Sequence, residues 1–137
     1  MQLVGLEVEG EYPRLMSPTL AGHVFKGDLA YVFRTSLLSK YKFPVFAGEK
    51  FVPELYIWNK IGDEGGIVFF GNEVIYLCDY LEDGYSKNFS VNLRRNPKGF
   101  FIFYKSQIGR EGSFLYKAKY FIRSMQCFLY ILLKRFS

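Results

Sequence analysis

The segment Pro53–Gly62, PELYIWNKIG, places the strongest constraint on what this chain can fold into. Proline suits the first turn of a helix, Glu54 complements the positive N-terminal end of the helix dipole, and glycine commonly follows the last helical residue. Leu55, Trp58 and Ile61 recur at close to helical spacing, which predicts a single buried face. We therefore expect a short helix that packs on a core.

The flanking sequence predicts short strands and loops. Strands are expected at 2–10 and 29–34, where Val, Leu, Tyr and Phe are frequent. Segment 11–27 lacks clear periodicity and contains two prolines and two glycines, which predicts a long loop. Segment 65–84 contains two apolar runs around a Gly-Asn pair, a pattern typical of a β-hairpin.

Helices are expected to dominate the rest of the chain. A short helix should begin near Thr35 or Ser36, with one of these hydroxyls as its cap, and end before Pro44. Further helices are expected in 86–96, in the segment after the NPKG motif, and in 112–135. No internal repeat occurs and strands do not alternate regularly with helices, so the predicted fold class is mixed α and β.

The composition narrows the class of protein. Fifteen Phe and eleven Tyr in 137 residues need partners inside the fold or on another surface. The chain has no uncharged apolar run of about 18 residues, the length that a membrane span requires. The first ten residues lack the basic start and apolar run of a signal peptide. Cys78 and Cys127 fit reduced thiols in the cytoplasm better than a disulfide framework or a zinc site.

The charge is unevenly distributed along the chain. Residues 94–137 hold ten Lys and Arg and one acid, a net charge of +9, whereas residues 1–93 have a net charge of −4. The tail at 112–137 combines cations with bulky apolar residues, which favours either an anionic membrane surface or a helix buried against a partner. Nucleic acid is not expected, since large aliphatic side chains crowd the same segment. The cations of this tail are Lys117, Lys119, Arg123, Lys134 and Arg135.

Several acidic residues are candidate site residues, each with an alternative structural explanation. Glu54 either complements a helix dipole or serves as a general base held among aromatic neighbours. Glu49, in AGEKF, is either a solvated loop charge or a second candidate for the base. Asp28 and the pair Glu82 and Asp83 lie beside glycines, which is typical of turns, and they can also hydrogen-bond sugar hydroxyls or contribute ligands to a metal ion. His23 has no nucleophile at a catalytic spacing, and no glycine-rich phosphate loop occurs.

Several motifs occur in the order found in a known family. They are a Gly-Asp pair at 27–28, FRT at 33–35, GEKFVPE at 48–54, the Trp-Asn-Lys triplet at 58–60, YLEDG at 80–84 and NPKG at 96–99. Together they closely resemble a bacterial branch of glycosyltransferase family 2. The resemblance covers residues 26–99, and more loosely the first expected strand.

The resemblance implies the GT-A fold, an α/β sandwich, of which this chain contains the C-terminal, acceptor-side half. Residues 1–111 would form that part of the catalytic domain, and 112–137 a basic amphipathic helical tail. Family members transfer a sugar from a nucleotide-sugar donor to a glycan or lipid-linked acceptor. Their donor half carries an Asp-x-Asp motif that binds Mg or Mn, and no such motif occurs in this chain. The isolated chain is therefore expected to be inactive. Since acceptors in this family are often lipid-linked or surface glycans, the resemblance also implies a cytoplasmic location, peripheral at the inner face of the cytoplasmic membrane.

The resemblance also assigns roles to individual residues. Glu54 is followed six positions later by Lys60, as the base of many family members is followed by a basic residue, and Glu49 is the second candidate. The alternative function is a non-catalytic, membrane-peripheral or protein-interaction module derived from this scaffold. Substrate-binding roles are implied for Asp28, Arg34, Trp58, Asn59, Lys60, Glu82 and Asp83.

Overall fold

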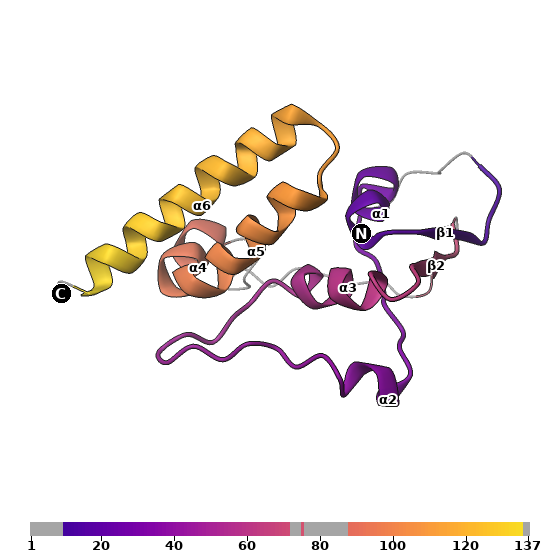
Figure 1. Cartoon of the computed structure of the whole chain (residues 1–137), viewed down its shortest axis with the longest axis horizontal. Coiled ribbons are helices and arrows are strands. Elements are labelled where there is room, and N and C mark those ends of the chain that lie inside the picture. The colour runs from indigo at the N-terminus through magenta and orange to yellow at the C-terminus, as the bar shows by residue number, and fades with distance from the viewer. Residues whose placement is uncertain (1–9, 72–74, 76–87, 136–137) are drawn as a thin grey trace. The chain divides into compact units, whose positions relative to one another are not determined.

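The computed structural model describes residues 10–71, 75 and 88–135. The chain divides into two compact units (Figure 1). Unit 1 comprises Met1–Lys42 and Ile57–Asp79, and unit 2 comprises Phe43–Tyr56 and Tyr80–Ser137. The strand expected at 2–10 lies outside the described residues except for its last position. The second strand of the expected hairpin, apart from Ile75, and Cys78 also lie outside them.

Unit 1 contains a small antiparallel sheet, two complete helices and most of a third. Strand β1 (Arg14–Met16) pairs with β2 (Ile67–Phe69), so that the backbone of Met16 faces that of Ile67. Helix α1 (Pro18–Phe25) follows β1 directly, and helix α2 (Thr35–Leu38) lies further along the chain. The core of this unit consists of Met16, Ala21, Phe25 and Phe69, with half-buried Tyr12, Val24, Leu29, Tyr31 and Ile67 packed around them.

The prediction of a long loop at 11–27 is wrong, because β1 and α1 occupy this segment. The Ser17 hydroxyl accepts a hydrogen bond of 3.2 Å from the Leu20 amide, and Pro18 lies in the first turn of α1. A serine cap followed by proline is a helix-start pattern. The sequence interpretation treated that proline as a breaker. Helix α1 ends at Lys26, which adopts the left-handed conformation with φ 49°.

The prediction of a strand at 29–34 is also wrong. Tyr31 stacks on Phe33 and on Trp58, and Phe33 contacts Trp58 with tilted rings, while Val32 between them is 89% exposed. The side chains therefore alternate as they do in a strand. No described segment pairs with this one, because β1 and β2 form the only sheet in the described part of the chain.

Helix α3 (Leu55–Gly62) confirms the helix expected here, although Pro53 and Glu54 precede it rather than forming its first turn. Its fully buried residues are Ile57, Asn59 and Ile61, whereas Leu55 and Trp58 are half-buried. The expectation of one buried face is therefore wrong in part. The physical reason is that α3 starts in unit 2 and continues in unit 1, so different positions contribute to different cores.

The short helix near residue 35 is confirmed as α2, but neither expected hydroxyl caps it. Arg34 occupies the cap position without a side-chain hydrogen bond. Its carbonyl oxygen accepts hydrogen bonds from the amides of Leu37 and Leu38, at 2.9 and 3.0 Å. Backbone groups thus close the start of the helix, whereas at its end the Ser39 hydroxyl donates a hydrogen bond of 3.0 Å to the Ser36 carbonyl oxygen.

Unit 2 is mainly helical. It contains α4 (Phe89–Arg95), α5 (Pro97–Arg110) and α6 (Phe114–Arg135), and α6 runs back along α5 (Figure 1). These helices confirm the ones expected, except that α5 begins within the NPKG motif rather than after it. The expected domain boundary between residues 111 and 112 falls between α5 and α6. The core comprises Leu93, Phe100, Phe103, Tyr104 and Cys127, with half-buried Phe51, Leu55, Tyr56, Phe101, Tyr120 and Tyr130 around it.

Burial keeps the thiol of Cys127, in the core of unit 2, protonated. Cys127 is a free cysteine with none of its surface exposed. Desolvation by the surrounding residues raises the pKa of its thiol to about 12. The thiol therefore acts as a small apolar group in the core of unit 2 at neutral pH.

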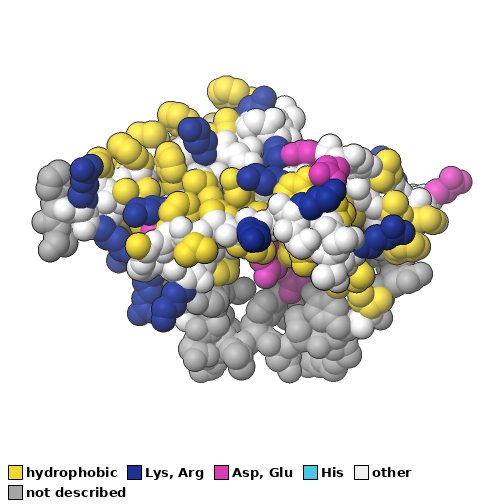
Figure 2. All heavy atoms as spheres, turned by 60° about the horizontal axis from the view of Figure 1, so that its bottom comes forward, with side chains coloured by type: hydrophobic (Ala, Val, Ile, Leu, Met, Phe, Trp, Pro, Cys, Tyr) yellow, Lys and Arg dark blue, Asp and Glu magenta, His cyan; other side chains and the backbone are white. Residues whose placement is uncertain are grey.

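The described residues form six helices and one two-stranded sheet, so the fold class is mixed α and β, as predicted. Not all of the apolar side chains are buried in this fold. Figure 2 shows hydrophobic side chains at the surface, with Lys and Arg among them. The most exposed large apolar residues are Val32, Val45, Phe114 and Leu115, at 89%, 91%, 81% and 78%.

The first turn of α5 approaches the backbone of another segment so closely that it requires a glycine. A β-carbon at Gly99 would collide with the carbonyl oxygen of Phe51 and lie 3.1 Å from a methyl group of Val52. The opposite case occurs later in the same helix, at Gly109, where a β-carbon would meet nothing within 4 Å.

We predict opposite effects of alanine at these two glycines of α5. Gly99→Ala should lower the free energy of unfolding by about 1–3 kcal/mol, because a backbone carbonyl cannot move aside cheaply. Gly109→Ala should raise it by roughly 0.5–1 kcal/mol, because glycine is a poor helix former. Urea denaturation followed by circular dichroism measures both. Equal effects of the two substitutions would contradict the close approach at Gly99.

Candidate functional site

Glu49, one of the two candidate bases, is held by the N-terminus of α5. Its Oε1 accepts a hydrogen bond of 3.0 Å from the Lys98 amide, and its Oε2 accepts one of 2.9 Å from the Gly99 amide. The first amides of a helix have no partner within the helix, and its N-terminal end favours negative charge. Both carboxylate oxygens are therefore used to cap α5 from a distant segment of the chain.

A second contact joins the same two segments. The Lys50 amide donates a hydrogen bond of 2.7 Å to Oδ1 of Asn96, and the Asn96 side-chain amide donates to Oδ1 and the carbonyl oxygen of Asn92. Asn96 is buried, and its side chain is thus fully used. The GEKF and NPKG motifs, distant in sequence, are therefore bound directly to each other.

Glu54, the other candidate base, is exposed and immediately precedes α3. It lines a hollow of about 320 Å³ in unit 2, and Glu49 lines the same hollow. The remaining walls come from one continuous stretch: Phe43, Pro44, Val45, Phe46, Lys50, Phe51 and Val52. The structure thus brings both predicted carboxylates to one largely apolar hollow. Their surroundings differ, since the Glu49 carboxylate accepts two backbone hydrogen bonds and Glu54 lies at the surface.

The residues of the Trp-Asn-Lys triplet have different environments in unit 1. Trp58 is half-buried, with its ring centroid 4.9 Å from that of Phe33 and 5.7 Å from that of Tyr31. Asn59 is 1% exposed, and its Oδ1 accepts a hydrogen bond of 3.0 Å from the Thr19 hydroxyl. The Asn59 side chain is therefore part of the interior, where it links α3 to α1. Lys60 is half-buried.

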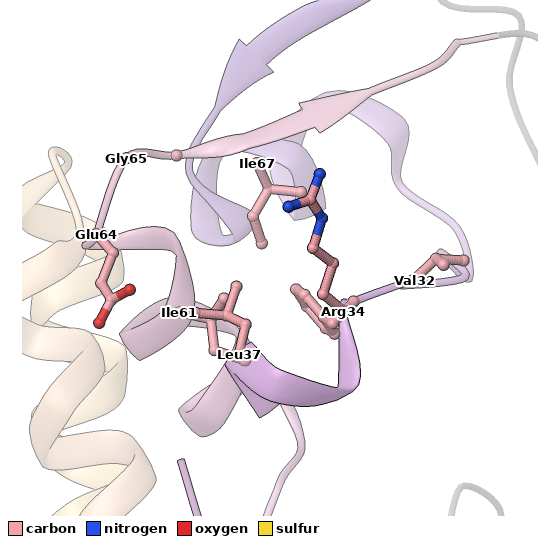
Figure 3. Close-up of a pocket in the computed structure, with 9 residues that line it drawn as sticks. Val32, Arg34, Leu37, Ile61, Glu64, Gly65 and Ile67 are labelled. Atoms are coloured by element: carbon pink, nitrogen blue, oxygen red, sulfur yellow. The ribbon is translucent and has the colours of Figure 1, made fainter. Parts of the chain in front are cut away.

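Arg34 lines a hollow of about 390 Å³ in unit 1 (Figure 3). Leu37, Ile61 and Ile67 provide apolar walls, and the exposed Glu64 lies at the other side of the hollow from Arg34 (Figure 3). The Tyr41 hydroxyl donates a hydrogen bond to the Glu64 carboxylate, and this bond, together with burial and the nearby acids, raises the pKa of Tyr41. The tyrosine thus remains protonated at neutral pH.

The other predicted substrate-binding residues do not add to either hollow. Asp28 is exposed in the segment between α1 and α2. Glu82 and Asp83 lie outside the described residues. Of the predicted site residues, Glu49 and Glu54 thus share a hollow in unit 2. Arg34 lines the separate hollow of unit 1. Asp28, Trp58, Asn59 and Lys60 belong to the same unit but do not line that hollow.

The described residues provide neither a metal-binding cluster nor a membrane span. Within residues 10–71, 75 and 88–135, no three His, Cys, Asp or Glu side chains are placed to hold a metal ion. In the same part of the chain, no helix has both the length and the apolar character needed to cross a bilayer. The Mg or Mn site implied by the family resemblance therefore has no ligand set among these residues.

No protein-family model matches this chain, and no match was found among curated proteins or among solved structures.

The sequence interpretation missed the structural role of Glu49 and the Tyr41–Glu64 pair. Glu49 bonds to residues 49 and 50 positions later, and Tyr41 to a residue 23 positions later. Local patterns carry no information on such distances. The one available signal for Glu49 was the glycine of NPKG, because a glycine near a helix start often marks a close approach of another group.

We predict that the two glutamates of the unit 2 hollow differ in their effect on stability. Glu49→Gln should lower the free energy of unfolding by about 1–2 kcal/mol, because it removes the charge and one of the two acceptors of the α5 amides. Glu54→Gln, at the surface, should change it by less than about 0.5 kcal/mol. Urea denaturation gives both values.

Hydrogen exchange provides a residue-level readout for the same pair of variants. The amides of Lys98 and Gly99 should exchange faster in Glu49→Gln than in the parent chain, because Glu49 accepts their hydrogen bonds. In Glu54→Gln their exchange rates should equal those of the parent. Unchanged exchange at both amides in Glu49→Gln would show that the carboxylate does not cap α5.

Proposed function

We propose that this chain is the acceptor-side part of an inverting glycosyltransferase related to family 2, with a GT-A fold completed by a donor-binding half. The motifs at 27–99 support this proposal by their order and spacing. The structural observation that supports it best is the contrast between the two glutamates. Glu49 is bound to the α5 amides, whereas Glu54 is exposed at the rim of the same hollow.

In the proposed mechanism, Glu54 is the general base. Its carboxylate accepts the proton of an acceptor hydroxyl as that oxygen forms a bond to the anomeric carbon of the sugar. The bond from this carbon to the nucleoside diphosphate breaks on the opposite face, which inverts the configuration. A general base must be positioned and accessible. Pro53 directly before Glu54 and α3 directly after it restrict the backbone at this position.

Glu49 supports the same hollow without taking the proton. Its carboxylate and the Lys50 amide attach the segment that leads to Glu54 to the start of α5. The rings of Phe51 and Phe100 lie 5.5 Å apart, centroid to centroid, and add an apolar contact between the two segments. Glu49 is thus a positioning residue in this proposal. No step is assigned to a metal, since the described residues supply no ligand set for one.

The isolated chain is predicted not to transfer sugar. It contains no Asp-x-Asp motif, which in family 2 enzymes holds the metal on the donor diphosphate. The test incubates the purified 137-residue chain with nucleotide-sugars and divalent metal and measures nucleoside diphosphate release. A family 2 enzyme with both halves serves as the positive control. Turnover by the chain alone would overturn the division into donor and acceptor halves.

With a donor-binding half supplied in the same polypeptide, Glu54→Gln should lower kcat by about 10²–10⁴, the usual contribution of a positioned base. Donor binding, measured by calorimetry, should stay unchanged. Glu11→Gln is the matched control, because Glu11 is also exposed and lines neither hollow.

The same assay distinguishes the two glutamates. Folded Glu49→Gln should lose less of kcat than Glu54→Gln, because the base itself is unchanged and glutamine keeps one acceptor for the α5 amides. If Glu54→Gln keeps the parental rate while fully folded Glu49→Gln loses it, Glu49 is the base and the assignment is wrong.

A further inference from the structure

Helix α6 turns a wide apolar face away from unit 2. Its inner side packs on the core through Tyr120, Ser124 and Cys127, of which the last two are buried. On the opposite side, large exposed apolar residues are distributed along the length of the helix. They are Phe114, Leu115, Phe121, Ile122, Met125, Leu129 and Leu133, with exposed fractions between 43% and 81%.

This face is continuous rather than scattered. An α-helix turns by about 100° per residue, which places these seven side chains within roughly one third of the helix circumference. A soluble monomer usually exposes large apolar residues singly, and a continuous stripe along a 22-residue helix marks an interaction surface. The inner contacts orient α6 on unit 2, so these side chains are not needed for its core.

Exposed cations flank the apolar face on both edges. In the same projection, Lys117 and Arg135 lie about 110° to one side of its centre and Lys119 about 90° to the other side. All three are exposed, whereas the Lys134 ammonium donates to the Arg95 carbonyl and Arg123 to Gln126 within unit 2. Helix α6 contains no acidic residue.

We propose that α6 binds flat on an anionic lipid membrane surface. In this orientation the apolar side chains enter the boundary between headgroups and acyl chains, while the flanking lysines and arginine reach the lipid phosphates. The observation that selects this partner is the combination of an outward apolar stripe, cations on both edges and no acid on the helix. This proposal goes beyond glycosyl transfer and does not depend on it.

A second copy of the chain is a weaker fit to the same face. Two α6 helices packed through their apolar stripes would place like charges from both edges next to one another, and no acid on α6 offsets them. An anionic bilayer instead offers negative charge on every side of the helix. A helix in this orientation also needs no transmembrane length.

Sedimentation with lipid vesicles tests the proposal on the full 137-residue chain. The chain should partition onto vesicles of phosphatidylcholine and phosphatidylglycerol and much more weakly onto phosphatidylcholine alone. High salt should reduce the binding to the mixed vesicles, because it screens the electrostatic part of the interaction.

Substitutions of the apolar residues and substitutions of the flanking cations should lower vesicle binding in distinguishable ways. Ile122→Ser and Leu129→Ser should each lower the partition coefficient roughly tenfold, because each withdraws one buried apolar side chain from lipid. Lys117→Gln and Lys119→Gln should each lower it about fivefold on anionic vesicles only. Val45→Ser and Lys105→Gln, at exposed positions elsewhere in unit 2, are the matched controls and should bind as the parent does.

Several results would contradict the proposal that α6 binds an anionic membrane. It fails if the chain does not bind the mixed vesicles, if it binds both vesicle types equally, or if the α6 variants bind as the controls do. It also fails if light scattering shows a dimer that Ile122→Ser dissociates while vesicle binding is unaffected, since a second copy would then cover the face. Circular dichroism of each variant checks that the helices are retained.

Discussion

The structure of unit 2 depends on one electrostatic contact, between the Glu49 carboxylate and the first amides of α5. A helix start leaves its amides without internal partners, and a charged acceptor satisfies them more strongly than a neutral one. Here that acceptor comes from a loop about 50 residues earlier in the chain. The Lys50 amide and the Asn96 side chain extend this contact by one more hydrogen bond. The approach is so close that the backbone at Gly99 leaves no room for a side chain.

This contact gives the two glutamates of GEKFVPE different chemistry. They are separated by five positions and line the same hollow, yet Glu49 uses both oxygens inside the protein and Glu54 faces solvent. Both Glu49 oxygens accept hydrogen bonds from the α5 amides, so this carboxylate is oriented toward the helix start. The Glu49 contact also attaches the segment that leads to Glu54 to the α5 terminus. A structural acid and an accessible acid in one motif are consistent with the proposed roles of positioning residue and base.

The high aromatic content has two different explanations in this fold. In unit 2, Phe100, Phe103 and Tyr104 form the core between α5 and its neighbours, and burial raises the pKa of Tyr104 to about 12. In contrast, Phe114 and Phe121 on α6 point away from this core. The same residue types thus stabilise the fold on one side of the helical hairpin and provide a surface on the other. The membrane proposal rests on this second set together with the flanking cations.

The sequence by itself predicted the elements whose signals are local. Helices α3 and α6, the basic and apolar character of 112–135 and the mixed fold class followed from periodicity, helix-end residues and charge, all of which act over a few neighbouring positions. The helix at 18–25 was equally readable from Ser17 and Pro18, and was missed because proline also breaks helices. Tertiary structure alone decided the rest: the pairing of β1 with β2, the lack of a pairing strand for segment 29–34 among the described residues, and the capping of α5 by Glu49. Each of these depends on which distant groups meet, and local patterns do not identify the partner: Gly99 signals a close approach but not the segment that approaches.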